Sequence, residues 1–233
     1  MLLPLAAGPR GPLARRAKGG WEGFCPIFPL PTVGEGAGEG KARNDFTLIP
    51  DFSKMRDDKY LYDKLSRYVV FDVETTGLRL WRNDRVIEIG AVAVIDGDMV
   101  EEFHTLIDAD KPITKAAQKI HGITREMVAG QPKAKDALTA FQRFIGNSTL
   151  VAHNADFDIG FLGYEYSRIG QGLRNRHICT LKLNRKLYPG LPDYRLETLA
   201  KHILGIEIDK GRHHRALDDA RLTARIWLEM RKK

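Results

Sequence analysis

Short runs of apolar and β-branched residues recur along the chain after residue 67, as in strands buried within a sheet. The predicted strands are 68–73, 86–95, 99–107, 149–152 and 177–180. Longer segments with apolar residues at helical spacing predict helices at 115–121, 135–145, 156–168, 195–204 and 216–230. Asp96-Gly97, between the second and third strands, is a hairpin signature, so these strands should pair antiparallel. A hairpin followed by alternating helices and strands predicts an α/β domain, with a mixed sheet flanked by helices.

Residues 1–45 have a different composition from the rest of the chain. They hold 9 of the 22 glycines and 6 of the 11 prolines. A segment of this composition has too few large apolar side chains to form a core. We expect a disordered extension there, then a connecting segment at 46–66 with a short helix at 57–65, and a compact domain at 67–233. Basic residues follow the first apolar run instead of preceding it, which argues against a secretory signal. An organelle transit peptide stays open, although serine is missing there.

Charge and cysteine content narrow the class of protein. The 233 residues carry a net charge of +7, and residues 168–233 hold 16 basic against 7 acidic side chains. This excess suggests a polyanionic partner, and a solvated helical surface is the alternative. Two cysteines, Cys25 and Cys179, are too few for a disulfide scaffold, so we expect a reducing, cytoplasmic compartment. No apolar stretch reaches about 18 residues, so we expect no membrane-spanning helix.

Acidic residues occur at the end of one predicted strand and at the start of two predicted helices. Asp72 and Glu74 are two residues apart on the first strand and therefore project to the same side. The other two groups are Asp156 with Asp158, and Asp218 with Asp219 shortly after His213 and His214. Each group alone has an ordinary explanation, as a polar strand end or as first-turn acids favoured by the helix dipole.

The combination of the three groups points to a metal site. Strand ends and helix starts gather at one edge of an open sheet, where ligands bind. Four carboxylates that converge there would repel one another unless divalent ions neutralised them. Oxygen-only ligands favour Mg²⁺ or Mn²⁺, and a histidine of near-neutral pKa would add a proton acceptor.

The residues around these acids carry a resemblance to a known family. The segments are 71–78 (Phe-Asp-Val-Glu-Thr-Thr-Gly-Leu), 153–162 (His-Asn-Ala-Asp-Phe-Asp-Ile-Gly-Phe-Leu) and 214–220 (His-Arg-Ala-Leu-Asp-Asp-Ala). They resemble the three exonuclease motifs of the DEDDh 3′–5′ exonucleases, above all the proofreading epsilon subunits of bacterial DNA polymerase III. The segments 86–90, 120–124 and 194–199 are also similar to that group. The resemblance covers about residues 67–230 and implies an RNase H-like fold with a five-stranded mixed sheet flanked by helices.

The resemblance also implies roles for individual residues. Two divalent metal ions, Mg²⁺ or Mn²⁺, would be held by four carboxylates: Asp72 as the bridging ligand, Glu74 and Asp219 at the ion that carries the attacking water, and Asp158 at the second ion. His214 would be the general base, whereas Asp156, Asp218 and His213 have no implied role. The residues implied to contact the terminal nucleotide are Thr75, Thr76, Leu78, Ile120, His121 and Phe157. For His121 an alternative stays open, since it would also end a helix before Gly122.

The implied function is a metal-dependent 3′–5′ exonuclease that hydrolyses DNA to nucleoside 5′-monophosphates, in proofreading or repair. Two alternatives stay open: the same chemistry on RNA ends, since no residue clearly reads a 2′-hydroxyl, and a nucleic-acid-binding module without catalysis. The expected partner is single-stranded or 3′-terminal DNA, or RNA, held along its phosphates by Arg174, Arg176, Lys182, Arg185 and Lys186. A DNA polymerase is a further implied partner. Because the tail that tethers the epsilon subunit is missing after the third motif, a stand-alone enzyme is expected equally.

Overall fold

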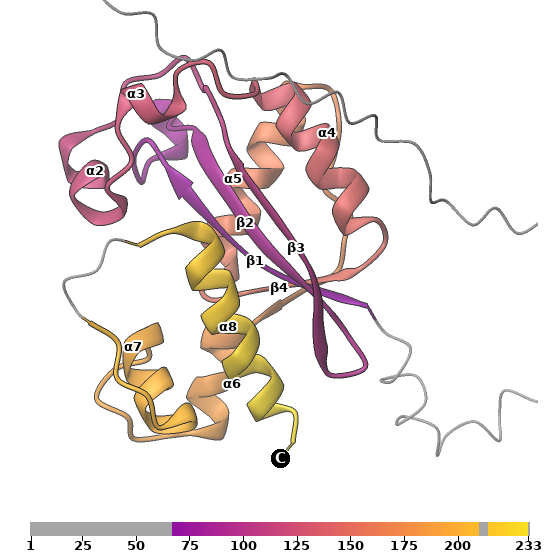
Figure 1. Cartoon of the computed structure of the whole chain (residues 1–233), viewed down its shortest axis with the longest axis vertical. Coiled ribbons are helices and arrows are strands. Elements are labelled where there is room, and N and C mark those ends of the chain that lie inside the picture. The colour runs from indigo at the N-terminus through magenta and orange to yellow at the C-terminus, as the bar shows by residue number, and fades with distance from the viewer. Residues whose placement is uncertain (1–66, 210–213, 233) are drawn as a thin grey trace, which may run out of the picture. The chain divides into compact units, whose positions relative to one another are not determined.

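The computed structural model describes residues 67–209 and 214–232, and a five-stranded mixed sheet forms their centre (Figure 1). The predictions for residues 1–45, for 46–66 and for His213 lie outside the described residues. The strands are β1 (Tyr68–Thr75), β2 (Val86–Ile95), β3 (Asp98–Leu106), β4 (Thr149–Ala152) and β5 (His177–Cys179). Their order is β3-β2-β1-β4-β5; β2 is antiparallel to β1 and β3, and β4 is parallel to β1 and β5. The five predicted strands are confirmed, with ends shifted by at most two residues.

The hairpin between β2 and β3 has the predicted geometry. Asp96 and Gly97 both have positive φ angles, 54° and 92°, as a two-residue type I′ turn requires. Ile95 and Asp98 therefore pair across the turn, and the antiparallel pairing continues along both strands with one register shift between Ala93 and Val94.

The two faces of the sheet pack against different helices. Val69, Phe71 and Val73 of β1 lie in one core with α4 (Ala134–Ile145) and α5 (Ala155–Arg168). Val70, between them, packs on the other face against α8 (Ala216–Met230). Because side chains alternate along a strand, Asp72 and Glu74 lie on the face of β1 that α8 covers.

Close packing of α8 on β2 depends on a glycine. A Cβ added to Gly90 would lie 2.1 Å from the backbone nitrogen of Leu217 and 2.3 Å from the carbonyl carbon of Ala216. Gly90 is also the residue of β2 that pairs with Asp72 of β1. The glycine therefore lets the first turn of α8 approach the sheet beside Asp72.

The helices agree with the predictions except in their shortest segments. The predicted helices are confirmed as α2 (Lys115–His121), α4, α5 and α8. The helix expected at 195–204 is also confirmed, except that α7 (Leu196–Leu199) continues as a π-helix, η3 (Ala200–Leu204). Apolar spacing over ten residues does not distinguish α from π hydrogen bonding. Three further helices were not predicted: the 3₁₀ turn η2 (Leu80–Arg82), α3 (Arg125–Val128) and α6 (Thr180–Leu187). η2 and α3 are too short for a periodic signal, and α6 begins with alternating apolar and polar residues.

Cys179 ends β5, is 9% exposed and lies in the core on the α4 and α5 face of the sheet. In the described ranges, none of the helices has the length and apolar character needed to cross a membrane.

Candidate active site

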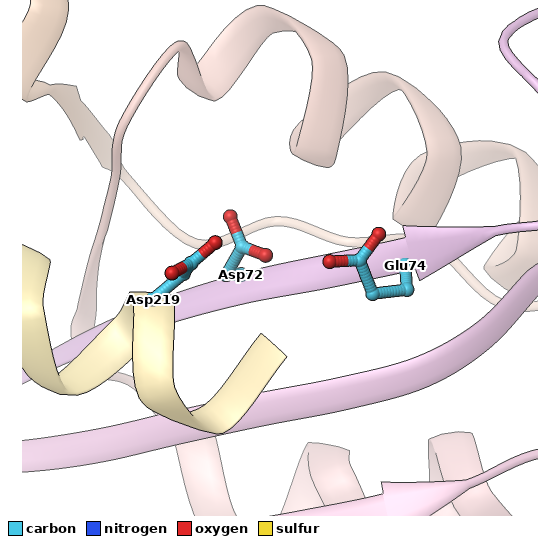
Figure 2. A group of neighbouring side chains, drawn as sticks. All are labelled: Asp72, Glu74 and Asp219. Carbon is cyan, nitrogen blue, oxygen red and sulfur yellow. The ribbon is translucent and has the colours of Figure 1, made fainter. Parts of the chain in front are cut away.

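Three carboxylates from two distant segments meet at one edge of the sheet. Asp72 and Glu74 come from β1, and Asp219 comes from the first turn of α8 (Figure 2). One oxygen from each of the three carboxylates lies within 4.8 Å of the others. No lysine or arginine of the described ranges forms an ion pair with Asp72 or Glu74. The group is therefore a concentrated negative charge, which suits oxygen-ligated divalent ions.

Asp158, the fourth predicted carboxylate, is placed by a gap in the sheet. β4 pairs with β1 only as far as Val70, so the backbone N–H of Val73 has no hydrogen-bond partner on β4. This N–H donates to Oδ1 of Asp158, in the first turn of α5, at 3.2 Å. Asp158 is 2% exposed and lies close enough to Asp72 that each affects the other's ionisation. It is not one of the three residues whose oxygens lie within 4.8 Å of one another.

The start of α8 is positioned by a buried acid on β2. Arg215, just before the helix, donates to both carboxylate oxygens of Glu88 at 2.6 to 3.2 Å, and the N–H of Ala216 donates to the same carboxylate at 3.0 Å. His104 of β3 lies 2.7 Å from Glu88, and its side chain is 39% exposed. Burial alone would raise the pKa of Glu88, but the hydrogen bonds from Arg215 and Ala216 lower it. The ionised Glu88 thus caps α8 and orients Asp219, which is one turn further along.

His214 has the geometry of a proton acceptor held by an acid. Its Nδ1 lies 2.9 Å from Oδ2 of Asp219, and its backbone N–H donates to the carbonyl of Ile120 at 3.0 Å. Its Nε2 is 3.9 Å from Glu197, beyond hydrogen-bond distance, and the side chain is 42% exposed. The hydrogen bond that Nδ1–H of His214 donates to Asp219 raises the pKa of His214 above its ordinary value.

One pocket of ≈ 820 Å³ joins these groups. Asp72, Glu74, Asp158, Asp219 and His214 all line it. Of the predicted nucleotide contacts, Ile120 and Phe157 also line the pocket. The pocket lining thus combines carboxylates with apolar side chains.

The other four predicted nucleotide contacts do not line this pocket. Thr75 and Thr76 are buried; the hydroxyl of Thr75 donates to the carbonyl of Gly77, and the hydroxyl of Thr76 accepts from the N–H of Arg85. Leu78 is 68% exposed on the loop after β1. For each of these three residues, direct contact with a nucleotide stays a prediction.

His121 ends α2 directly before Gly122, whose φ of 69° is the left-handed cap expected there. It is 2% exposed, with Nδ1 accepting from the N–H of Ile123 at 3.0 Å. Its Nε2 donates to the carbonyl of Thr75 at 3.2 Å. The ring therefore joins the end of α2 to the end of β1, and this placement supports the interpretation as a helix end.

His153 and Glu197 also line the pocket, although the sequence motifs implied no role for them. Nε2 of His153 donates to the carbonyl of Tyr194 at 2.8 Å, and Nδ1 accepts from the hydroxyl of Thr180 at 3.0 Å. Burial lowers the pKa of His153, so the neutral ring is favoured and holds the 193–198 segment over the pocket. His153 is the first residue of the 153–162 motif and directly follows a predicted strand, and this position could have indicated a place in the site.

The carboxylates fit divalent metal ions by their ionisation as well as by their position. Burial, with the nearby charge of Asp158, raises the pKa of Asp72 well above its ordinary value. Burial, with the charges of Asp219 and Glu88, raises the pKa of Glu74 to about 8, and burial raises the pKa of Asp158 to about 7. Ionised together these groups destabilise one another, and divalent cations would remove that cost.

This electrostatic conflict predicts an unusual pH dependence of stability. Glu74 and Asp158 have unfolded pKa values near 4 and folded values of about 8 and about 7, so the folded state holds extra protons between these limits. Their contribution is favourable at low pH and is lost as the pH rises through that window. In EDTA, the unfolding temperature should therefore fall from about pH 5 to about pH 8, and Mg²⁺ should restore it at the upper end.

A matched pair of variants tests the cause. Glu74→Gln should flatten the fall in unfolding temperature and weaken the Mg²⁺ response, because one of the mutually repelling charges is gone. Asp218→Asn should behave as the wild type, since Asp218 is exposed and pairs with Arg221 at 3.0 Å. A wild-type unfolding temperature that is constant or rises over this range in EDTA would contradict the prediction.

Comparison with known proteins places this site in a family. Residues 69–227 match the protein family described as Exonuclease. The chain is 46% identical over 159 residues to the DNA polymerase III PolC-type of Clostridium perfringens, and 41% identical over 170 residues to that of Thermotoga petrophila. These matches cover 68% and 71% of this chain but only 11% and 12% of the polymerases.

Solved structures agree with the sequence matches. A structure of Exonuclease X in complex with 5′ overhanging duplex DNA is 34% identical, with a TM-score of 0.58, and the match covers 72% of this chain and 93% of that one. A structure of E. coli Exonuclease I in complex with an oligonucleotide is 19% identical, with a TM-score of 0.63 over 72% of this chain and 41% of that one, and shows the fold alone. The RNase H-like fold expected from the motifs is confirmed.

Proposed function

Because the chain belongs to the exonuclease family, we propose that it is a metal-dependent 3′–5′ exonuclease that removes nucleoside 5′-monophosphates from DNA. The observation that carries the proposal is the convergence of Asp72, Glu74 and Asp219, with oxygens within 4.8 Å of one another, in a pocket that His214 also lines. Carboxylates that are costly to ionise together would bind divalent ions, and a neighbouring histidine would accept a proton. Both groups suit hydrolysis of a phosphodiester.

The donor set fits two divalent ions, Mg²⁺ or Mn²⁺. Asp72, Glu74 and Asp219 would hold one, and Asp158 would hold the other together with Asp72. When bound, such ions supply positive charge where the attacking and leaving oxygens of the phosphodiester become negative. Glu88 acts indirectly, because it fixes the start of α8 and hence the direction of Asp219.

His214 is the proposed general base. If Nδ1–H donates to Asp219, the lone pair of Nε2 is directed away from that acid and can accept the proton of the attacking water. Its raised pKa makes this base stronger than free imidazole, and it must be neutral to act. Glu197, 3.9 Å from Nε2, would stabilise the imidazolium that forms.

The pocket supports recognition of a terminal nucleotide without reading its sequence. Ile120 is 47% exposed although it lines the pocket, and Phe157 on α5 lines the same pocket. Apolar and aromatic side chains stack on any base, because every base has a π-face. Arg185 and Arg195 line the same pocket and would contact phosphates, with binding that weakens as salt rises.

The proposed polymer is DNA and the proposed setting is replication or repair beside a DNA polymerase. Relatives named DNA polymerase III PolC-type, and Exonuclease X in complex with DNA, support this choice over RNA. The chain spans only 11% of those polymerases. We therefore propose that it shares the task of a polymerase-associated exonuclease, and partnership with a polymerase is part of this proposal.

Time-resolved hydrolysis of 5′-labelled oligonucleotides tests the function. With Mg²⁺ or Mn²⁺, single-stranded and 3′-mismatched DNA should give a ladder of labelled products shortened one nucleotide at a time, with nucleoside 5′-monophosphates released. Matched RNA of the same sequence should be degraded more slowly. Release of the label in a mononucleotide at the start would show 5′–3′ polarity. Binding of the DNA without any product in either metal would favour a module without catalysis.

A further inference from the structure

The loop that follows β1 exposes a tryptophan that the proposed active site does not use. Trp81, in η2, is 79% exposed, more than any other large hydrophobic side chain in the described ranges. It does not line the active-site pocket. An isolated exposed leucine needs no explanation, but a tryptophan exposes far more apolar surface to water.

Hydrogen bonds and one ion pair hold the backbone of this loop against the domain. Asp84 accepts from the N–H of Arg79 at 2.9 Å and pairs with Lys111 at 3.2 Å, and Lys111 also donates to the carbonyl of Arg82. The hydroxyl of Tyr164, on α5, donates to the side chain of Asn83 at 2.6 Å. The loop therefore presents Trp81 in a fixed place, so little chain entropy is lost when a ligand covers the ring.

The base of the loop is closed just as tightly. A Cβ on Gly77 would lie 2.4 Å from the carboxylate of Asp84, so only glycine fits between the two ends of the loop. Leu80, next to Trp81, turns inward and packs near Gly160 of α5. Because Leu80 packs against the core, the neighbouring Trp81 side chain points to solvent.

The charge around the ring selects a nucleic acid. Arg79 and Arg82 are both exposed on the same loop, and the guanidinium carbon of Arg79 lies 5.9 Å from the centre of the Trp81 ring. Neither arginine forms an ion pair within the described ranges. An exposed aromatic ring with two arginines on the same loop fits a base next to phosphates, because bases stack on aromatic rings and phosphates pair with arginine.

The position of the loop relates this surface to the active site. The loop begins directly after β1, whose last residues include Glu74, and it packs on α5, which carries Asp158. Because Trp81 lies outside the pocket where the terminal nucleotide is proposed to bind, it would meet a different nucleotide. We propose that Trp81 is a stacking platform for a base of the nucleic-acid substrate other than the one being removed, with Arg79 and Arg82 on its phosphates. This inference rests on the proposed function, since it takes nucleic acid as the substrate.

Binding of two probes to three variants tests the platform. The probes are thymidine 5′-monophosphate and a twelve-nucleotide deoxythymidine oligomer with phosphorothioate linkages at its 3′ end, both in Mg²⁺. Trp81→Ala should weaken binding of the oligomer about 5- to 100-fold, the range for losing one base–aromatic stack, and leave the mononucleotide unchanged. Trp81→Phe should retain most of the affinity, and Val100→Ala, an exposed apolar control at 54% exposure on β3, should retain all of it.

Tryptophan fluorescence supplies a signal that does not depend on turnover. The chain has three tryptophans, and Trp227, on α8, packs on the sheet and is only 7% exposed. The oligomer should quench the wild type, and the quenching should be lost in Trp81→Phe even though binding persists. Equal affinity of wild type and Trp81→Ala for the oligomer, or an equal loss for the mononucleotide, would overturn the platform.

The same measurements separate this inference from the proposed function. If the protein releases nucleotides from unmodified DNA but Trp81→Ala binds and degrades it as the wild type does, the platform is wrong and the function stands. If the oligomer binds and quenches through Trp81 but no nucleotide is ever released, the exonuclease is wrong and the platform stands.

Discussion

Asp158→Asn and Asp219→Asn should each lower the rate of nucleotide release on the order of 10³-fold or more, whereas Asp156→Asn and Asp218→Asn should leave it within about threefold. The four substitutions form two matched pairs, each made of neighbouring acids at the start of one helix. Asparagine keeps the shape of aspartate and removes only its charge. The comparison therefore tests the position of the charge in the fold.

The structure separates the members of each pair clearly. Asp158 and Asp219 are 2% exposed and line the pocket. The side chain of Asp156 is 63% exposed and pairs with Lys182 at 2.8 Å, and that of Asp218 is 56% exposed and pairs with Arg221. Exposed ion pairs of this kind contribute little to stability, so their loss should be almost silent.

Steady-state rates on single-stranded DNA in Mg²⁺ measure the effect, and unfolding temperature serves as the control for folding. Asn at position 158 can still accept the N–H of Val73, so the fold should survive. Removal of one of several repelling charges should also keep the unfolding temperature in EDTA at or above that of the wild type. Comparable losses for Asp156→Asn and Asp158→Asn would show that the pocket is not where hydrolysis occurs.

His214→Ala should lower the maximal rate by about 10²- to 10⁴-fold, the range for removing a general base. The wild-type rate should rise with pH as His214 loses its proton, because only the neutral ring can accept one. The hydrogen bond with Asp219 raises the pKa of His214, which places this rise above the pH at which free imidazole titrates. Bound metal ions would lower that pKa, because they neutralise Asp219 and Glu74.

The pH–rate profile distinguishes a general base from a residue that only supports the fold. In His214→Ala the remaining activity should no longer show the rise assigned to His214, while the increase of unfolding temperature with Mg²⁺ should persist, since the carboxylates remain. His202→Ala is the matched control, because His202 is exposed and its ring contacts Tyr188 at 5.3 Å, outside the pocket. An unchanged profile in His214→Ala would show that the proton goes elsewhere.

Several features of the fold and site were accessible from the sequence because they depend on local patterns. Alternation along β1 placed Asp72 and Glu74 on one side, and this holds in the structure, where both lie on the face that α8 covers. The hairpin at Asp96-Gly97 was accessible for the same reason, since its two residues adopt the positive φ angles that few other residue types tolerate.

Other features depended on contacts between segments far apart in the chain. The cap that Glu88 provides for α8 joins residues more than 120 positions apart, and no local pattern predicts it. The change from α-helix to π-helix after Leu199 also has no local signal in the sequence, and both segments belong to the core formed with α8.

By itself, the sequence determined which residue types gather at the edge of the sheet, since strand alternation and helix starts are local and leave few choices for an acid next to a buried strand. Only the tertiary structure decided that Asp72, Glu74 and Asp219 share one site, that Asp158 fills the gap where β4 ends, and that Trp81 stays outside it. The physical reason is that the direction of a side chain follows from its own backbone, whereas its distance from a partner depends on how whole elements pack.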